Sequence, residues 1–223
     1  MGRKKMVRFE ANEAAYNVIQ AGKPSFETIK GNWQTTHFKN TLPITVELAC
    51  GRGEFTVGLA RAYADRNFIG VDIKGSRIWK GSTQAQEEGL NHVAFLRTQI
   101  QLLDQFFAPG EVDCFWITFP DPFPRDGDEK RRLTSPRFLD MYKQLLRPDG
   151  LIHFKTDNTG LFLYTEELLK ERKDVELEAI TYDFYASPYK EEHLGIKTRY
   201  EKIFSDKGET IKYLRFRFKS ETE

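Results

Sequence analysis

Ile44-Thr45-Val46-Glu47-Leu48-Ala49-Cys50-Gly51-Arg52-Gly53-Glu54-Phe55 is a run of β-favouring residues that stops at two closely spaced glycines. The pattern predicts a buried strand over 44–50, a tight loop, and a helix over 55–64, where apolar residues recur at helical spacing. A strand, a glycine loop and a helix in this order are typical of nucleotide-binding α/β sheets. The stretch therefore predicts the fold class, which is α/β.

The rest of the chain continues the alternation of strands and helices. A helix over 76–88, with Ser76 as N-cap and Gly89 as its stop, follows the second strand, and Pro148-Asp149-Gly150 is expected to form a turn. Such alternation predicts a doubly wound, mostly parallel seven-stranded sheet in which the last two strands form an antiparallel edge pair. The further expected strands are 67–73, 93–96, 112–119, 151–156, 175–182 and 211–218, and the further helices are 137–146 and 160–172.

The length of 223 residues fits one main domain. We assign residues 1–42 to an N-terminal extension with one short helix near 24–31, and residues 43–223 to the domain itself. No apolar run approaches the roughly 20 residues of a membrane helix. Cys50 and Cys114 lie in apolar runs, which predicts two buried thiols in a reducing, cytoplasmic compartment. The four scattered His predict no structural metal.

The net charge of +1 excludes a globally basic protein, so binding of nucleic acid requires a local patch. One candidate is the tail with Arg3, Lys4, Lys5 and Arg8. The other is Arg125 with the run Lys130-Arg131-Arg132. Either charge run is also compatible with an ordinary solvated surface.

The glycine loop predicts a cationic adenosine cofactor. Thr56 stands where a dinucleotide fingerprint has its third glycine, and Glu47 lies four residues before Gly51. A carboxylate repels a pyrophosphate but suits the sulfonium and amino groups of S-adenosylmethionine; the alternative is a charge at the strand edge. Asp72, about 20 residues after the loop, is placed to bind a ribose diol. Gln99 is a candidate for the adenine edge or an ordinary surface residue.

The stretch after the fourth strand predicts the acceptor site. Three prolines in Pro120-Asp121-Pro122-Phe123-Pro124 make a stiff loop at the carboxyl end of a central strand. Phe123 is a candidate to stack on a nucleobase, and Asp121 to contact the cofactor or guanine. Asp157, after the fifth strand, is aimed at the same rim, whereas His153 is expected to be a core histidine. The alternative is a rigid loop that only caps the sheet.

At these residues the sequence resembles the bacterial tRNA (guanine-N7)-methyltransferase family, from about Val46 to Leu214. The resemblance implies a Rossmann-like methyltransferase that uses S-adenosylmethionine, with a guanine in the tRNA variable loop as substrate. It implies that the cofactor is bound by Glu47, Asp72, Gln99 and Asp121, and the target guanosine by Arg125, Asp157, Thr198, Arg199, Tyr200 and Glu201. The residue patterns described above add Gly51 and Gly53 to the cofactor site and Phe123 to the guanosine site. They also predict Asp121 as the catalytic positioner and contacts to RNA phosphates from Lys130, Arg131 and Arg132.

The sequence departs from the family pattern at several positions. Phe123 replaces the usual tryptophan, Arg125 the usual lysine, and Gln99 the usual acidic residue. The stretch Asp126-Gly127-Asp128-Glu129 stands where the family tends to carry cations, which is expected to weaken phosphate binding.

Three other functions are considered. The acidic stretch favours a methyltransferase for another RNA or a small molecule. A non-catalytic RNA-binding subunit is disfavoured by the retained carboxylates, and an oxidoreductase by Glu47 and the missing third glycine. Monomer and homodimer both remain open.

Overall fold

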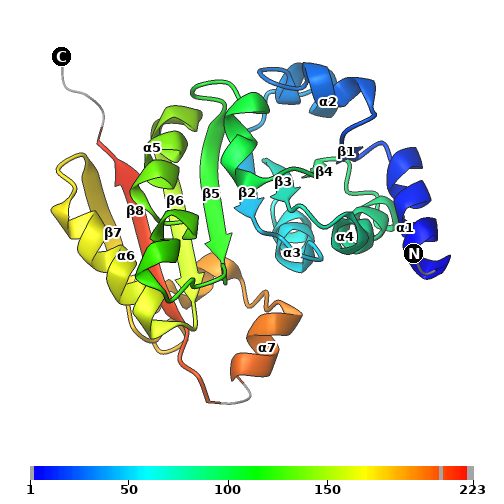
Figure 1. Ribbon diagram of the computed structural model, residues 1–223. Coiled ribbons are helices and arrows are strands. Elements are labelled where there is room, and N and C mark those ends of the chain that lie inside the picture. Colours follow the sequence, from blue (N-terminus) through cyan, green and yellow to red (C-terminus); the bar gives the residue numbers. More distant parts are fainter. Residues whose placement is uncertain (1–2, 206–207, 220–223) are drawn as a thin grey trace.

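The computed structural model describes residues 3–205 and 208–219, which form one sheet covered by helices on both faces (Figure 1). Across these residues the sheet has eight strands in the order β1-β4-β3-β2-β5-β6-β8-β7. Pairs from β1 to β6 are parallel, and β8 is antiparallel to both of its neighbours. The strands are β1 (Val18–Ile19), β2 (Ile44–Leu48), β3 (Asn67–Val71), β4 (Val93–Leu96), β5 (Val112–Thr118), β6 (Leu146–Thr156), β7 (Val175–Thr181) and β8 (Lys212–Phe218).

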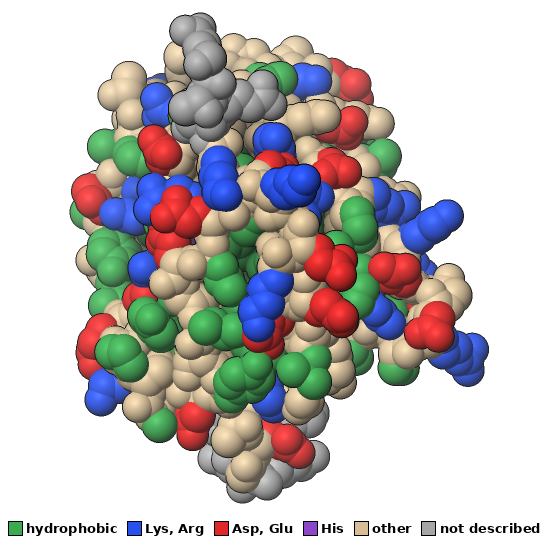
Figure 2. Space-filling model, turned by 90° about the vertical axis from the view of Figure 1, so that its left-hand side faces the viewer, with side chains coloured by type: hydrophobic (Ala, Val, Ile, Leu, Met, Phe, Trp, Pro, Cys, Tyr) green, Lys and Arg blue, Asp and Glu red, His purple; other side chains and the backbone are tan. Residues whose placement is uncertain are grey.

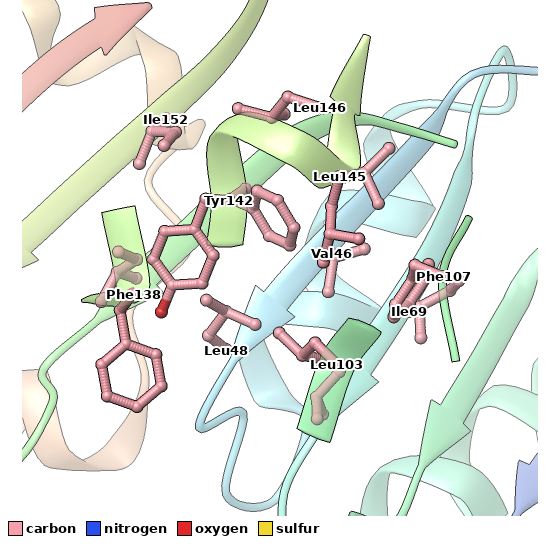
Figure 3. Packing of buried hydrophobic residues seen from close by; sticks show 14 of the residues in the cluster. Val46, Leu48, Ile69, Leu103, Phe107, Phe138, Tyr142, Leu145, Leu146 and Ile152 are labelled. Carbon is pink, nitrogen blue, oxygen red and sulfur yellow. The ribbon is translucent and has the colours of Figure 1, made fainter. Parts of the chain in front are cut away.

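The helices divide the core into two apolar layers. One layer packs against α3 and α4, and the other packs against α5 and α6. Figure 3 shows the second layer, where Phe138 and Tyr142 of α5 approach Leu48 of β2. The helical segments are α1 (Arg3–Ala14), α2 (Pro24–Thr28), η1 (Trp33–Phe38), α3 (Glu54–Ala62), α4 (Gly75–Glu87), η2 (Ile100–Gln105), η3 (Asp126–Arg131), α5 (Pro136–Leu145), α6 (Thr159–Glu171), η4 (Pro188–His193) and α7 (Arg199–Ser205).

The doubly wound sheet with an antiparallel edge pair is confirmed, but the sheet gains one strand from the N-terminal region. Val18 and Ile19 pair with Phe95 and Leu96 at the end of the sheet. Trp33 is fully buried and its ring N–H donates to the carbonyl of Phe106 at 2.9 Å. The prediction of one short helix in residues 1–42 was incomplete, because a two-residue strand and short helical segments show no periodicity in sequence.

Three local predictions are corrected. Ser76 does not cap α4: the cap residue is Lys74, whose N–H is bound by the Asp72 carboxylate at 2.7 Å. The segment 148–150 is no separate turn but lies inside β6 at a register shift. Cys114 is half-buried, unlike the buried Cys50. Gly89 does stop α4, with a left-handed φ of 67°.

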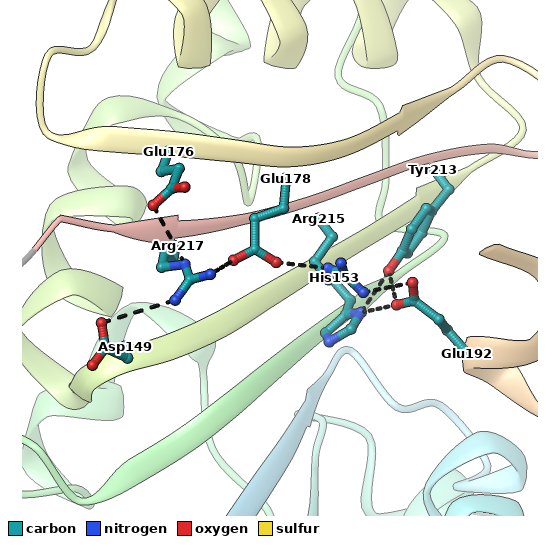
Figure 4. A network of polar contacts seen from close by, with 8 residues as sticks. All are labelled: Asp149, His153, Glu176, Glu178, Glu192, Tyr213, Arg215 and Arg217. Atoms are coloured by element: carbon teal, nitrogen blue, oxygen red, sulfur yellow. Dashed lines mark hydrogen bonds and ion pairs between the residues drawn. The ribbon is translucent and has the colours of Figure 1, made fainter. Parts of the chain in front are cut away.

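The antiparallel edge carries a polar network on one face (Figure 4). His153 lies within it as a core histidine: it stacks on Trp116 at 4.1 Å and bonds the Tyr213 hydroxyl at 2.7 Å. Burial lowers the pKa of His153, and Glu192 opposes this effect. Glu192 also contacts Arg215 at 2.6 Å, which fastens η4 to the sheet. The network therefore stabilises the edge and positions the segment that leads to α7.

Candidate functional site

Glu47 is a buried carboxylate at the carboxyl end of β2, where it is 3% exposed. It accepts hydrogen bonds from the Thr56 N–H at 2.9 Å, from the Thr56 hydroxyl, and from the Thr118 hydroxyl at 2.8 Å. Burial raises the pKa of Glu47 to about 7, although these bonds act in the opposite direction. A partly desolvated carboxylate that lines a hollow is suited to a cationic ligand.

The glycine loop turns sharply because its residues adopt left-handed backbone angles. Gly51 and Gly53 have φ of 57° and 69°, and Ala49 has φ of 58° without being glycine. A Cβ on Gly53 would lie 2.5 Å from a ring carbon of Phe95. Gly51 lines the hollow beside Glu47, whereas Gly53 serves the packing of the loop on β4.

Asp72 directly follows β3 and connects its end to this loop. Its carboxylate accepts the Gly51 N–H at 3.0 Å and the Lys74 N–H at 2.7 Å, one at each oxygen. Each oxygen keeps a further lone pair, so the carboxylate is able to accept two hydroxyls. Gln99 and Asp72 line a second hollow, and the Gln99 side chain accepts a hydrogen bond from Gln101 at 2.7 Å.

The proline loop follows β5 at the carboxyl end of that strand. Phe119 and Phe123 have positive φ of 50° and 42°, which are uncommon for aromatic residues and are found where a site holds the backbone under strain. Asp121 is exposed and lines the same hollow as Asp72. The stiff loop therefore brings the third carboxylate to the same edge.

Asp157 and Tyr200 meet on the other side of this loop. The Tyr200 hydroxyl donates to Asp157 at 3.4 Å, and the Tyr200 ring lies 5.4 Å from that of Phe119. Burial, with the negative charges of Asp157 and Asp121, raises the pKa of Tyr200 to about 12. Figure 1 shows α7, which carries Tyr200, below the arrowhead of β5.

Two hollows that share lining residues lie at this edge, and together they are called the depression. The hollow at Glu47 has a volume of about 470 Å³ and the hollow at Asp72 about 360 Å³. Ala49, Arg77 and Phe119 line both. The depression lies at the switch point, where β2 is flanked by β3 and β5, and such points bind ligands in open α/β sheets.

Among the described residues, no group of three or more His, Cys, Asp or Glu side chains has an arrangement that could bind a metal ion. In the described part of the chain, no helix has the length and apolar character needed to cross a membrane.

Comparisons with known proteins assign the chain to a family. The family model described as "Putative methyltransferase" matches residues 41–214. The tRNA (guanine-N(7)-)-methyltransferase of Cytophaga hutchinsonii is 46% identical over 98% of this chain and 99% of its own length. The chain belongs to the tRNA (guanine-N(7)-)-methyltransferase family. The same-named protein of Bacteroides thetaiotaomicron is 44% identical over 99% of this chain and 88% of its own length.

Solved structures agree with the fold. The 16S rRNA methyltransferase KamB superposes with a TM-score of 0.64 at 16% identity, over 92% of this chain and 99% of that one. A 30S ribosomal A1408 methyltransferase from an uncultured bacterium gives 0.61 at 14% identity, over 85% and 94%. At these identities the likeness concerns the fold of this methyltransferase family member and not its substrate.

The structure brings most predicted residues of the methyltransferase to one edge but turns Glu201 inward. Its carboxylate is fully buried and accepts the Lys155 ammonium at 2.9 Å and the Tyr185 hydroxyl. By contrast, Thr198, Arg199 and Tyr200 line the hollow at Glu47. Glu201 therefore holds this segment in place, and its neighbours face the depression.

Two cations of the basic run, Arg131 and Arg132, already have interaction partners within or next to their own loop. The Arg131 guanidinium lies 4.2 Å from the Phe123 ring and pairs with Asp128 at 3.1 Å. Arg132 donates to the Phe123 carbonyl at 3.1 Å and lies over the Tyr164 ring. The acidic stretch thus balances part of this run, while Lys130 and Arg125 are exposed.

The residues that hold the predicted site carboxylates in position were not identified from the sequence. Thr56 and Thr118 hold Glu47, and Lys155 holds Glu201. Lys155 is 0% exposed and lies 4.9 Å and 5.3 Å from the rings of Phe55 and Phe119. The available signal was a lysine within the buried half of β6, because lysine is almost never fully buried unless it is paired.

Proposed function

We propose that this protein transfers a methyl group from S-adenosylmethionine to N7 of a guanine in the variable loop of tRNA. The observation that carries the proposal is the depression at the switch point, which Glu47, Asp72 and Asp121 line in a chain of this family. With the two free cysteines, the tRNA substrate supports a cytoplasmic location.

The residues present fit this cofactor. Glu47 offers a desolvated negative charge for its cationic end, and Asp72 offers two lone pairs for its ribose hydroxyls. Gly51 would allow close approach of the cofactor, and Gln99, which lines the hollow at Asp72, would contact the adenine edge. S-adenosylmethionine supplies a methyl group bound to a positively charged sulfur. Residues 43–223 would form the methyltransferase domain, with 1–42 as an extension that adds β1 to its sheet.

Methylation at N7 requires the protein to orient the guanine and does not require it to remove a proton first. Guanine N7 carries a lone pair and no proton, so no residue has to act as a base beforehand. Asp121 and Asp157 would accept the N1 and N2 hydrogens of guanine and orient the ring. Their negative charges would also stabilise the ring as it becomes cationic. Arg125, Phe123 and the residues 198–200 would hold the rest of the nucleoside.

Asp121→Asn is expected to lower kcat by roughly 10- to 100-fold, because the amide loses the charge that orients and stabilises the ring. The rate is measured at saturating tRNA and cofactor. Asp126→Asn removes an exposed carboxylate at the start of η3, close to Asp121 in sequence, and serves as the matched control, with kcat within about twofold of the parent. Equal rates for the two variants would remove Asp121 from this role.

The substrate class is tested by offering unmodified tRNA, small-subunit ribosomal RNA and free guanosine with labelled cofactor. We expect incorporation into tRNA alone, and its loss when the variable-loop guanine is replaced by adenine. Incorporation into ribosomal RNA but not tRNA would favour the alternative, a methyltransferase of the same fold for another RNA.

A further inference from the structure

A basic groove lies beside the proposed active site, between α3, α4 and the segment 194–202. Its volume is about 740 Å³. The charged residues that line it are five cations and one carboxylate, and these are Arg61, Lys80, Lys197, Arg199, Lys202 and Glu54. The chain as a whole carries a net charge of only +1, so this is a local concentration of positive charge.

The groove has a fixed wall because the late segment is fastened to α3. The Arg199 N–H donates to the Glu54 carboxylate at 2.6 Å. Gly58 of α3 lets Ile196 approach the helix, since a Cβ at this position would lie 2.5 Å from an Ile196 methyl carbon. The groove is therefore a product of the fold.

Nearby acids balance only part of this charge. Glu88 pairs with Arg61 through two bonds of 2.6 Å, and Glu54 lies 3.9 Å from Lys80. Lys197 lies 4.1 Å from the Tyr185 ring, and this cation–π contact does not neutralise the positive charge of Lys197. Counting both acids, the five cations leave an excess of three positive charges.

The groove is next to the hollow at Glu47, because Glu54 and Arg199 line both. A chain bound in the groove would therefore lie beside Thr198 and Tyr200 of the proposed acceptor site. The run Lys130–Arg132 has less free charge, because Asp128 pairs with Arg131 and Arg132 is used within its own loop.

We infer that this groove binds the phosphate backbone of the tRNA next to the methylated nucleotide, an inference that rests on the proposed function. Lys and Arg side chains that line a groove supply the sequence-independent part of RNA affinity, and releasing counterions makes that part depend on salt.

The test compares two double variants that make the same change of charge. K80E/K202E alters the groove; the Lys80 side chain is 50% exposed and Lys202 is exposed, so folding should be retained. K39E/K173E is the control and alters two exposed lysines beside η1 and α6, across the sheet from α3. The surface near α6 carries both acidic and basic side chains, so it has no concentration of positive charge like that of the groove (Figure 2). Binding of unmodified tRNA is measured from 50 to 300 mM salt, and cofactor binding and thermal melting are measured alongside.

K80E/K202E is expected to weaken tRNA binding at least tenfold at about 0.1 M salt and to reduce the salt slope by about two. K39E/K173E should change the affinity less than about threefold and keep the slope, and cofactor binding should be unchanged in both. Equal slopes for the two variants, or no tRNA binding by the parent protein, would overturn the inference. If the parent protein binds tRNA through the groove but does not methylate it, the proposed function is wrong and the inference that the groove binds tRNA is retained.

Discussion

Lys155→Met is expected to destabilise the protein by roughly 3–5 kcal/mol, because it leaves a buried carboxylate without its cation. Lys155 lies in β6 and Glu201 in α7, both with 0% exposed side chains and 2.9 Å apart. Burial lowers the pKa of Lys155, and Glu201 and then Glu47 oppose that effect. The same substitution should also strongly lower methyl transfer, since the segment 198–201 loses its ion pair with β6 beneath the acceptor site.

A double variant separates the lost ion pair from lost packing. K155M/E201M replaces both charges by flexible apolar side chains among the rings of Phe55, Phe119 and Phe184. It should recover at least half of the lost stability, because neither member of the pair is left as a buried charge without its partner. Denaturant unfolding measures both variants. A loss below about 1 kcal/mol for Lys155→Met would contradict the role given to the pair.

Glu47→Gln is expected to weaken cofactor binding by roughly 10- to 100-fold while leaving the unliganded protein at least as stable. The glutamine carbonyl is able to accept the Thr56 bonds, and its amide faces the Thr118 hydroxyl, which can accept instead. The negative charge opposite a cationic cofactor is lost. Isothermal calorimetry at pH 8 measures the affinity, and thermal melting measures the stability.

Because the pKa of Glu47 is raised, both the stability of the protein and its affinity for the cofactor should depend on pH. Its folded value of about 7 lies above the ordinary value of 4.5, so the folded state holds the proton more tightly. The free energy of unfolding therefore falls as pH rises from about 4.5 to 7, by roughly 3 kcal/mol from this group. Cofactor affinity should rise from pH 6 to 8 in the parent and stay flat in Glu47→Gln. Equal affinity of both proteins at pH 8 would contradict the assignment.

Much of the fold was predictable because the central strands are apolar runs bounded by turn residues. The strand over 93–96 and the stop of α4 at Gly89 are found as predicted. β1 was missed, since two residues have no period, and its pairing with β4 depends on contacts made across more than 70 positions of sequence. Ser76 was a plausible cap by composition, but the carboxylate of Asp72 binds the chain before α4 instead.

The site was predictable where strand ends converge, because parallel strands bring their carboxyl ends to one edge. Glu47, Asp72 and Asp121 do meet there. The inward turn of Glu201 was not predictable, because its partner Lys155 is 46 positions away on another element. The pairing of Asp128 with Arg131 was missed because the acidic stretch was considered only as a repeller of phosphate.

The central claim is tested most directly by identifying the product nucleoside. Unmodified tRNA is incubated with the protein and labelled S-adenosylmethionine, digested to nucleosides, and analysed by mass and retention time. The account predicts label in 7-methylguanosine alone. Label in another methylated nucleoside, or no transfer to tRNA at all, would contradict it.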